Sequence, residues 1–420
     1  MSILIQNVLV NGKIADIHIR GARIDQIAPS ITPEPGEERI DGTNQAAVPG
    51  FINGHTHAAM TLLRGFADDM ELKPWLEEKI WPAEATLTEE DVYVGTRLAC
   101  LEMIRTGTTT FNDMYWHLPG AVKAVQSMGL RGILSAVFID QFDAEKRKQQ
   151  IEENVAYIEQ FQGHDPLIQI ALGPHAIYTV SREALEWVRD TSEKYGLFVH
   201  IHLSETSQEV DDCLEAHDKR PVEYLNEIGL LSDRLFAAHC NWLNEKEIDL
   251  LVASGTHLVH NPISNLKLTV GNIFPYKVLS ERGASILLGT DGCSSNNNMD
   301  MLETAKFAAL FQKWQSNDPT LLPAAEALSL INREGYRAFR LGNGEIAPGE
   351  PADLVLFGLN HPQNVPLYNL ESNLVYAVNG TAATTTICNG RILMKEGVIP
   401  GEELIIAEAR QTAKKFARML

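Results

Sequence analysis

Between residues 47 and 288, short apolar segments alternate with stretches of helical periodicity. In one such stretch, Val94, Leu98, Leu101 and Ile104 fall on one face of a helix. Eight strands alternating with helices over about 250 residues are typical of a (β/α)₈ barrel, so we predict an α/β fold of this type. The predicted strands are Ala47–Ile52, Thr108–Phe111, Gly132–Phe138, Leu167–Leu172, Leu197–Ile201, Leu235–Ala238, Thr256–Val259 and Ser285–Leu288.

The first 48 residues have strand signals and little helical periodicity. Val8–Val10 leads into Asn11–Gly12, a pair typical of two-residue hairpin turns, and Ile14–Ile19 then alternates. After about Gly342 the strand signals return. Neither end is large enough to bury a core alone, so we predict that the two ends pair into one small β-sandwich domain.

The C-terminal strand signals are Ala352–Phe357 and Thr384–Cys388, and Asn389–Gly390 has the composition of a hairpin turn. A final amphipathic helix places four apolar residues on one side: Ile405, Ala409, Phe416 and Leu420. The expected division is residues 1–48 and 345–403 for the β-sandwich, 49–344 for the barrel, and 404–420 for the C-terminal helix.

The composition excludes several classes of protein. The chain has 55 acidic and 35 basic residues, a formal charge of −20, and such a surface repels nucleic acid. The first residues do not resemble a signal peptide, and no apolar run reaches the roughly 20 residues of a membrane helix. Five cysteines, widely spaced and without a C-x-x-C pair, favour reduced thiols and a cytoplasmic protein.

Histidines gather at the ends of the predicted strands, where the loops of such a barrel converge on one mouth. His55 and His57 follow the first strand, in "PGFINGHTH". Alternate residues of a strand project to the same side, so both rings can grip one ion. The remaining polar residues at strand ends are His175, His200, His202, His239, His260 and Asp291. Imidazoles with one carboxylate suit zinc or another borderline divalent metal, and a catalytic site keeps one position open for water.

Two of these histidines have competing interpretations. His200 and His202 compete for one ligand position. His202 is preferred because Glu205 follows three residues later, at the end of the same predicted strand. His200 is then a packed residue or one that supports a ligand. His260 is equally compatible with a structural role and with a position facing the substrate.

Seven motifs follow one another along the chain: "PGFINGHTHAAMTLLRGFADD", "WLEEKIWPAEATLTEEDV", "HIHLSET", "AAHC", "HNPISNLKL", "GTDG" and "GEIAPGEPADLVLF". Together they resemble the amidohydrolase superfamily, and within it the 5'-methylthioadenosine/S-adenosylhomocysteine deaminases, close to the triazine and guanine hydrolases. The resemblance implies one metal, held by His55, His57, His202 and Asp291. Two-metal relatives need a lysine after the fourth strand, where this chain has Leu172–His175. One Zn²⁺ per subunit is expected, and Fe²⁺ or Mn²⁺ is compatible with the same ligands.

The resemblance also implies a mechanism, in which water activated at the metal attacks C6 of an adenine ring. Glu205 would move a proton to ring nitrogen N1, and His239 would orient the water and help to deprotonate it. Asp291, both ligand and base, would pass a proton towards the leaving ammonia.

Five further residues are candidates for substrate recognition, and the resemblance implies the first of them. Glu84 would accept hydrogen bonds from the ribose 2'- and 3'-hydroxyls, and His175 would meet the sugar or the ring edge. Trp75 and Trp81 would cover the nucleoside or pack in the core. Arg147 would contact the carboxylate of S-adenosylhomocysteine or lie on a solvated helix face.

The residues at the end of the third strand, up to Phe138, include no arginine for that carboxylate. We therefore expect a small-molecule nucleoside substrate with a small or apolar 5' group: 5'-methylthioadenosine, 5'-deoxyadenosine or adenosine, with S-adenosylhomocysteine weaker.

Two other functions remain as alternatives. A guanine deaminase or a triazine-type chlorohydrolase or aminohydrolase would use the same metal and water, but its substrate has no diol for Glu84. A non-catalytic metal-binding barrel is the alternative from another class, although all the expected ligands are present. The oligomeric state, including a homo-oligomer, is left open.

Overall fold

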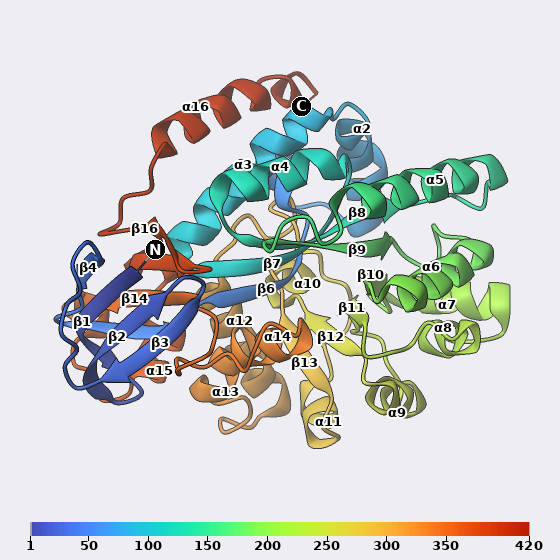
Figure 1. Cartoon of the computed structure of the whole chain (residues 1–420). Helices are drawn as coiled ribbons and strands as arrows, with labels where there is room; N and C mark the ends of the chain where they lie inside the picture. The colour runs from blue at the N-terminus through green and yellow to red at the C-terminus, as the bar shows by residue number, and fades with distance from the viewer. Residues whose placement is uncertain (1, 420) are drawn as a thin grey trace.

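Eight parallel strands form the centre of the computed structural model, which describes residues 2–419 (Figure 1). Their hydrogen-bonded order follows the chain from β6 to β13, as predicted for a (β/α)₈ barrel. All eight predicted strands are present. The strands are β6 (Phe51–Thr56), β7 (Thr108–Tyr115), β8 (Arg131–Phe138), β9 (Ile168–Pro174), β10 (Phe198–Leu203), β11 (Leu235–His239), β12 (His257–His260) and β13 (Ser285–Leu288).

The first predicted strand, Ala47–Ile52, was wrong in one respect, because it joins parts of two strands. β5 (Gln45–Pro49) belongs to the sheet of the chain ends, and β6 belongs to the barrel. Gly50 lies between them, and its N–H donates to the carbonyl of Asp353 at 3.0 Å. A side chain at this position would overlap Thr109. The chain therefore crosses from one sheet to the other within an apolar run that shows no break.

The seam between β6 and β13 closes the barrel at its mouth. The N–H of Asp291 donates to the carbonyl of His55 at 3.0 Å. The side chain of Asn53 bonds Thr290 twice, to its hydroxyl at 2.7 Å and from its N–H at 3.0 Å. These bonds fix the segment after β13 against the strand that carries the first histidines.

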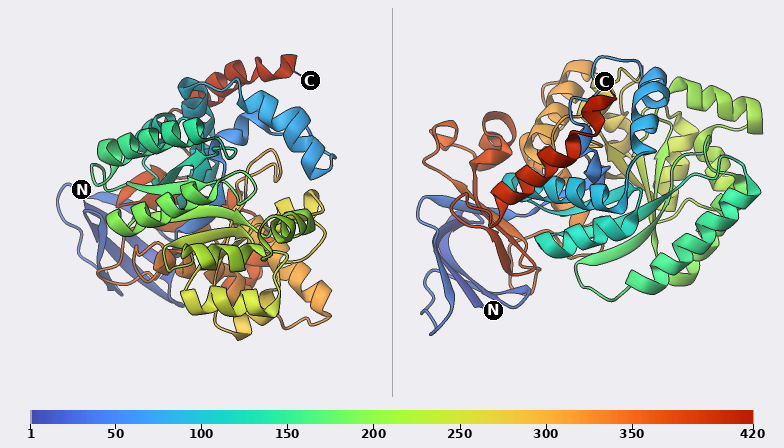
Figure 2. Two further views of the ribbon diagram at one scale, coloured as in Figure 1. Left: turned by 90° about the vertical axis from the view of Figure 1, so that its right-hand side faces the viewer. Right: turned by 90° about the horizontal axis from the view of Figure 1, so that it is seen from above.

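Helices surround the barrel (Figure 2). Between neighbouring barrel strands, the connection from β6 to β7 is the longest, and its first part contains η1 (Ala58–Leu63), α1 (Leu72–Pro74), η2 (Trp75–Ile80) and α2 (Trp81–Glu84). The other barrel helices are α3 (Glu89–Thr106), α4 (Leu118–Met128), α5 (Ala144–Phe161), α6 (Arg182–Tyr195), α7 (Ser207–His217), α8 (Pro221–Ile228), α9 (Glu245–Ser254), α10 (Pro262–Lys267), α11 (Tyr276–Glu281), α12 (Met301–Ser316), α13 (Ala324–Leu330) and α14 (Arg333–Ala338).

The two chain ends pair into one separate sheet, which we call the end sheet. Its strands are β1 (Ser2–Val10), β2 (Lys13–Arg20), β3 (Arg23–Ala28), β4 (Glu38–Asp41), β5, β14 (Leu354–Gly358), β15 (Ala383–Cys388) and β16 (Arg391–Met394). The order is β16-β15-β14-β5-β1-β2-β3, and β4 pairs with β1. The sheet curls until Ile24 exchanges hydrogen bonds with Gly349 and Glu350, just before β14. Its inner face buries a core of its own, which includes Ile3 and Leu354.

The two predicted hairpin turns of the end sheet have the backbone that their residues favour. Asn11 and Gly12 have φ of 49° and 76°, and Asn389 and Gly390 have φ of 51° and 68°. Asparagine and glycine tolerate this left-handed region, which explains both turns.

The chain then returns to the barrel. Helix α16 (Glu402–Ala413) leaves the end sheet and lies along α3 (Figures 1 and 2). Ile405, Ala409 and Phe416 are buried as predicted, whereas Leu420 lies outside the described residues. Short helical turns complete the C-terminal part: η3 (Pro362–Asn364), α15 (Leu370–Ser372), η4 (Asn373–Ala377), η5 (Gly380–Ala382) and η6 (Phe416–Arg418).

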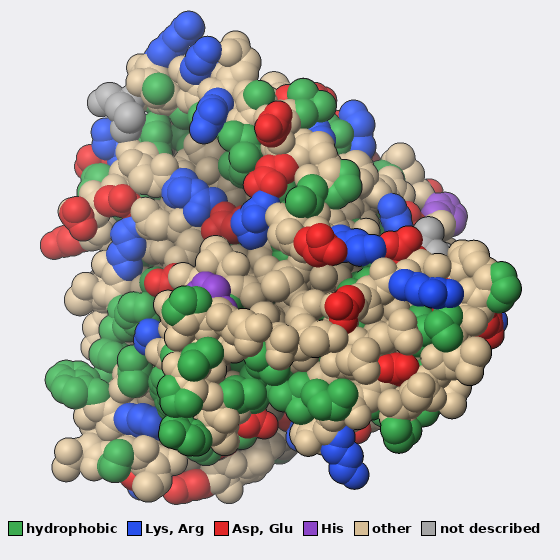
Figure 3. Space-filling model, turned by 90° about the vertical axis from the view of Figure 1, so that its left-hand side faces the viewer, with side chains coloured by type: hydrophobic (Ala, Val, Ile, Leu, Met, Phe, Trp, Pro, Cys, Tyr) green, Lys and Arg blue, Asp and Glu red, His purple; other side chains and the backbone are tan. Residues whose placement is uncertain are grey.

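Two surface features complete the description. Within residues 2–419, every helix is too short or too polar to cross a bilayer. On the side of the molecule that carries the end sheet, acidic and basic side chains are interspersed (Figure 3). The negative charge is therefore not gathered into one patch on that side.

Candidate metal centre and active site

Three histidines and one aspartate converge at the barrel mouth from three separate strands. His55 lies in β6 and His57 directly follows it, His202 lies in β10, and Asp291 follows β13. The Nε2 atoms of His57 and His202 are 3.2 Å apart. Oδ1 of Asp291 is 3.4 Å from Nε2 of both His55 and His57.

The hydrogen bonds of these rings determine which nitrogen faces the centre. Nδ1 of His57 lies 2.7 Å from the carbonyl of Met114, and Nδ1 of His202 lies 2.8 Å from the carbonyl of His175. A carbonyl only accepts, so both Nδ1 atoms donate and both Nε2 atoms carry lone pairs when the rings are neutral. Burial keeps His202 neutral by lowering its pKa well below the usual value.

Two lone pairs that face each other at 3.2 Å repel unless a cation lies between them. Four-coordinate zinc, with bonds of about 2.0–2.1 Å, holds neighbouring ligand atoms about 3.3 Å apart. The nitrogen and oxygen separations given above are close to this spacing. Nε2 of His55 is also buried without a hydrogen-bond partner within the described residues, and burial lowers the pKa of His55 to about 4. These side chains therefore fit a divalent cation.

Asp291 is held in place by its immediate surroundings. The hydroxyl of Ser264 donates to Oδ2 at 2.7 Å, and the N–H of Gly292 donates to Oδ1 at 2.8 Å. The Asp291 backbone has φ of 65°, a left-handed conformation that non-glycine residues adopt at a cost of about 1–3 kcal/mol. Strain of this kind is common where a side chain must be aimed at a site.

Glu205 and His239 lie beside this group of ligands. Burial raises the pKa of the Glu205 carboxyl, and its Oε1 is 3.7 Å from Nδ1 of His239. The same Nδ1 lies 2.9 Å from Oδ1 of Asn265. Burial alone would lower the pKa of His239, but the carboxylates of Glu205 and Asp291 outweigh it and raise that pKa. A nitrogen of His239 also comes within 4.8 Å of nitrogens of His55 and His202.

The cavity above this centre is lined by most of the predicted substrate residues. Trp75 is buried in its wall, whereas Trp81 is 37% exposed at its rim. Glu84, at the end of α2, lines the cavity beside Tyr115 and Trp116, and burial raises its pKa. His175 also lines it, with Nδ1 2.9 Å from the hydroxyl of Thr179.

Arg147 is the exception among the predicted substrate residues. Its guanidinium donates to the hydroxyl of Ser181 at 3.0 Å and lies 3.5 Å from Asp140, and it is absent from the cavity lining. The Arg147 side chain is 21% exposed and lies outside the cavity, against the start of α6 and beside the buried Asp140.

The other histidines with open roles are now placed. Nε2 of His200 lies 2.7 Å from Nδ1 of His55, so His200 supports a predicted ligand from behind. His260 stacks on Phe274, with ring centroids 4.6 Å apart, and does not line the cavity of Glu205. This position favours the structural interpretation of His260.

Sequence reasoning missed several residues that shape the site. Ser264 and Asn265 hold Asp291 and His239, and both lie in the "HNPISNLKL" segment, one helical turn after His260. Tyr115 and Tyr178 line the cavity. The position of Tyr115 directly before a loop, at the end of β7, was a usable signal. Tyr178 had none, because it lies in an irregular segment.

Comparison with known protein families agrees with this geometry. Residues 46–393 match the model of the amidohydrolase family. The chain belongs to the amidohydrolase family. It is 52% identical over 380 residues, 90% of this chain and 86% of the relative, to a 5'-deoxyadenosine deaminase of Methanoregula boonei. It is 42% identical over 404 residues, 96% and 95% of the two chains, to a 5-methylthioadenosine/S-adenosylhomocysteine deaminase of Archaeoglobus fulgidus.

Two solved structures are similar over almost the whole chain. An adenosine deaminase from Xanthomonas campestris with bound zinc has a TM-score of 0.91 and 33% identity, with 99% of this chain and 98% of that chain covered. The atrazine chlorohydrolase of Arthrobacter aurescens, 21% identical with a TM-score of 0.89 over 98% and 100% of the two chains, shares the fold. This amidohydrolase therefore has the fold predicted from its sequence, and its cluster of histidines and aspartate supports a divalent metal.

Proposed function

We propose that this amidohydrolase converts 5'-substituted adenosines into the corresponding inosines and ammonia. The observation that carries the proposal is one cavity that contains the paired Nε2 atoms of His57 and His202, the Glu205 carboxyl and the Glu84 carboxyl. The deaminase relatives described above support the same reaction. His55, His57, His202 and Asp291 are the proposed ligands of one Zn²⁺ per subunit.

The protein side chains supply the proton transfers. A divalent cation held by these ligands would supply Lewis acidity, which would lower the pKa of water at this position. Water adds to C6, and Glu205, whose pKa is raised by burial, delivers a proton to N1. His239 orients the water and helps to remove its first proton, which restores the proton that Glu205 gives to N1. Asp291 passes the second proton to the exocyclic amine, and C6 keeps the oxygen as a carbonyl. The C6–N bond then breaks and releases ammonia.

Recognition of the nucleoside follows from the cavity walls. The Glu84 carboxylate can accept two hydrogen bonds from the ribose diol, and His175 lies within the same cavity. The end of β8 contributes Val137, and Ile139 follows it, so this wall is apolar. Arg147 lies outside the cavity. A missing charged contact to a 5' carboxylate is worth about 1.5–3 kcal/mol, or one to two orders of magnitude in affinity. We therefore expect 5'-deoxyadenosine and 5'-methylthioadenosine to be preferred over S-adenosylhomocysteine.

The setting of the reaction is proposed to be cytoplasmic. All five cysteines lie within the described residues, are buried and have no disulfide partner. This pattern is typical of a reducing compartment.

A substrate panel with the matched variant E205Q tests the proposal. The wild type is expected to convert adenosine, 5'-deoxyadenosine and 5'-methylthioadenosine to inosines, followed by ultraviolet absorbance, and to contain one metal ion by elemental analysis. E205Q should lose about 10²–10⁴-fold in kcat with its metal content unchanged, because it cannot deliver the proton. Deamination of guanine without any adenosine would overturn the substrate, and full activity of E205Q would overturn the role of Glu205.

A further inference from the structure

Glu205 lies in the three-residue connection, Ser204 to Thr206, between β10 and α7. β10 ends at Leu203, and Thr206 caps α7, with its hydroxyl 3.2 Å from the N–H of Glu209. Ser204, the first residue of the connection, has φ of 51°. A serine is strained in this left-handed conformation, so the connection needs contacts that hold it.

Glu209 provides two of these contacts. Its Oε1 accepts the N–H of Ser204 and its Oε2 accepts the N–H of Glu205, both at 2.8 Å. In the usual capping box, a glutamate three residues into a helix bonds the N–H of the cap residue itself. Here the carboxylate reaches the two residues that precede the cap. Its contacts therefore fix the Glu205 connection rather than the end of the helix.

The opposite side of the connection is held by the segment after β11. The carbonyl of Ser204 accepts the N–H groups of Asn241 and Trp242, both at 3.0 Å. The side-chain amide of Asn241 donates to the carbonyl of Glu205 at 3.4 Å. The peptide that carries Glu205 is thus clamped between Glu209 and Asn241.

The burial of Glu209 indicates that these contacts matter. Its side chain is almost fully buried and lies close to Glu205, so the chain buries two carboxyl groups near each other. Burying a second acid beside the first is unfavourable unless it is well hydrogen-bonded. Both of its oxygens accept backbone N–H groups, and neither is used by the proposed chemistry.

We propose that Glu209 is a positioning residue, which holds the Glu205 backbone so that the Glu205 carboxyl stays aimed at the substrate ring. This inference rests on the proposed deaminase function. Glu209 lies behind Glu205 and does not touch the reacting atoms. Its contribution to turnover passes through Glu205, because a displacement of about 1 Å in a catalytic group can cost about 10²-fold in rate.

The substitution Glu209→Gln tests this role with little change in volume. The glutamine amide turns one acceptor into a donor that faces a backbone N–H, so one clamp bond is lost. We expect kcat for 5'-deoxyadenosine to fall at least 10-fold, with KM changed less than 3-fold and the metal content unchanged. If E209Q does not fold, E209D serves instead, since its shorter side chain reaches at most one of the two amides and should also lower kcat.

Thr206→Ala is the matched control, because it removes the cap of α7, which is a bond to the backbone N–H of Glu209, and leaves the bonds of the Glu209 carboxylate to Ser204 and Glu205 in place. It should lower the melting temperature while kcat stays within about 2-fold of wild type. Equal losses of kcat in T206A and E209Q would show that helix stability alone is responsible, and would overturn the proposal.

A double-mutant cycle separates positioning from a general structural effect. In the E205Q background, Glu209→Gln should cause no further loss of kcat, because the group it positions is already gone. An equal further loss there, or wild-type kcat in E209Q, would overturn the inference. A wild type that deaminates no adenosine would instead overturn the proposed function.

Discussion

The three histidines that face one another at the barrel mouth use their Nδ1 atoms in different ways. His57 and His202 donate to backbone carbonyls, which are fixed by the barrel strands. His55 instead has its Nδ1 2.7 Å from Nε2 of His200, a neutral buried imidazole whose pKa is lowered by burial. For His55 to donate, Nε2 of His200 must accept. A partner of this kind fixes both the tautomer and the orientation of a ligand.

Replacement of His200 by leucine should therefore weaken metal binding. The substitution leaves the Nδ1–H of His55 buried without an acceptor, and loss of such a partner commonly costs about 10–100-fold in metal affinity. Competition with a chelator measures this affinity directly. His257→Leu, at the opposite end of the barrel, is the control and should bind metal as the wild type does. Wild-type affinity in H200L would show that the contact is only packing.

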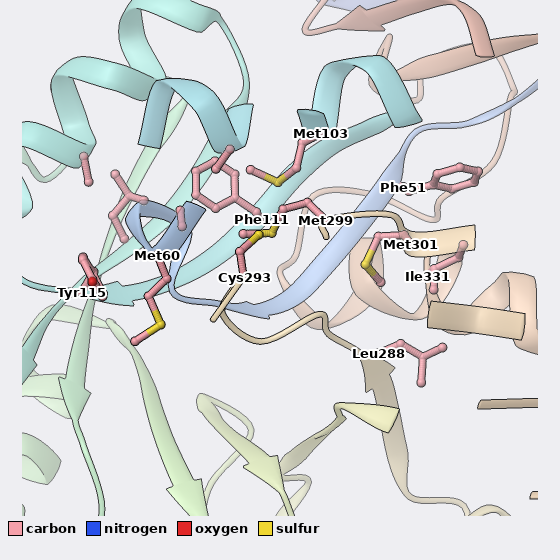
Figure 4. Packing of buried hydrophobic residues seen from close by; sticks show 14 of the residues in the cluster. Phe51, Met60, Met103, Phe111, Tyr115, Leu288, Cys293, Met299, Met301 and Ile331 are labelled. Carbon is pink, nitrogen blue, oxygen red and sulfur yellow. The ribbon is translucent and has the colours of Figure 1, made fainter. Parts of the chain in front are cut away.

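At the scale of elements, the position of His57, a proposed metal ligand, depends on how closely η1 approaches α3. A Cβ atom at Gly95 would lie 2.6 Å from the carbonyl oxygen and 2.9 Å from Cα of Ala59. The hydroxyl of Thr61 donates to the carbonyl of Gly95 at 2.7 Å. Figure 4 shows the neighbouring core, to which Met60, Phe111 and Cys293 belong. η1 directly follows His57, so the contact between η1 and α3 sets the position of the His57 backbone and therefore of its imidazole ring.

Gly95→Ala should push η1 away from α3 and displace His57. Overpacking of this kind costs about 1–3 kcal/mol of stability, and we expect weaker metal binding as well. Urea unfolding of the metal-free protein and chelator competition measure the two effects. Glu90→Ala, exposed in the first turn of α3, should change stability by less than about 0.5 kcal/mol. An unchanged urea-unfolding midpoint in G95A would mean that η1 and α3 can move apart with no loss of stability.

The elements also show where sequence reasoning works and where it stops. Strand ends with histidines were predictable, because a buried strand is an apolar run and the polar residue that ends it stands out. The β5–β6 crossing at Gly50 was not, since both strands are apolar and only the partner strands distinguish them. Asn265 contacts His239, which lies in a distant segment, and Glu209 departs from the ordinary capping box. Neither arrangement leaves a pattern in the sequence.

At the scale of the whole molecule, the end sheet and the barrel meet at the amino-terminal ends of the barrel strands, away from the mouth. Arg131 begins β8, and its Nε lies 2.9 Å from Oδ2 of Asp353, whose side chain is fully buried. The same guanidinium donates to Oδ1 of Asn389 at 2.7 Å. Asp353 precedes β14 and Asn389 follows β15, so a single arginine joins two segments of the end sheet to the barrel.

Replacement of Arg131 by methionine should destabilise the protein while leaving the active site intact. The change leaves the buried Asp353 carboxylate without its cationic partner, which costs about 3–5 kcal/mol of stability. The double variant R131M/D353N should recover part of that loss, because the unpaired charge is gone. Urea unfolding measures stability, and KM for 5'-deoxyadenosine, expected within 2-fold of wild type, reports on the mouth. Arg182→Met, which breaks a half-exposed pair with Glu227, should cost less than about 1 kcal/mol. Equal losses in R131M and R182M would mean that the junction does not depend on this pair.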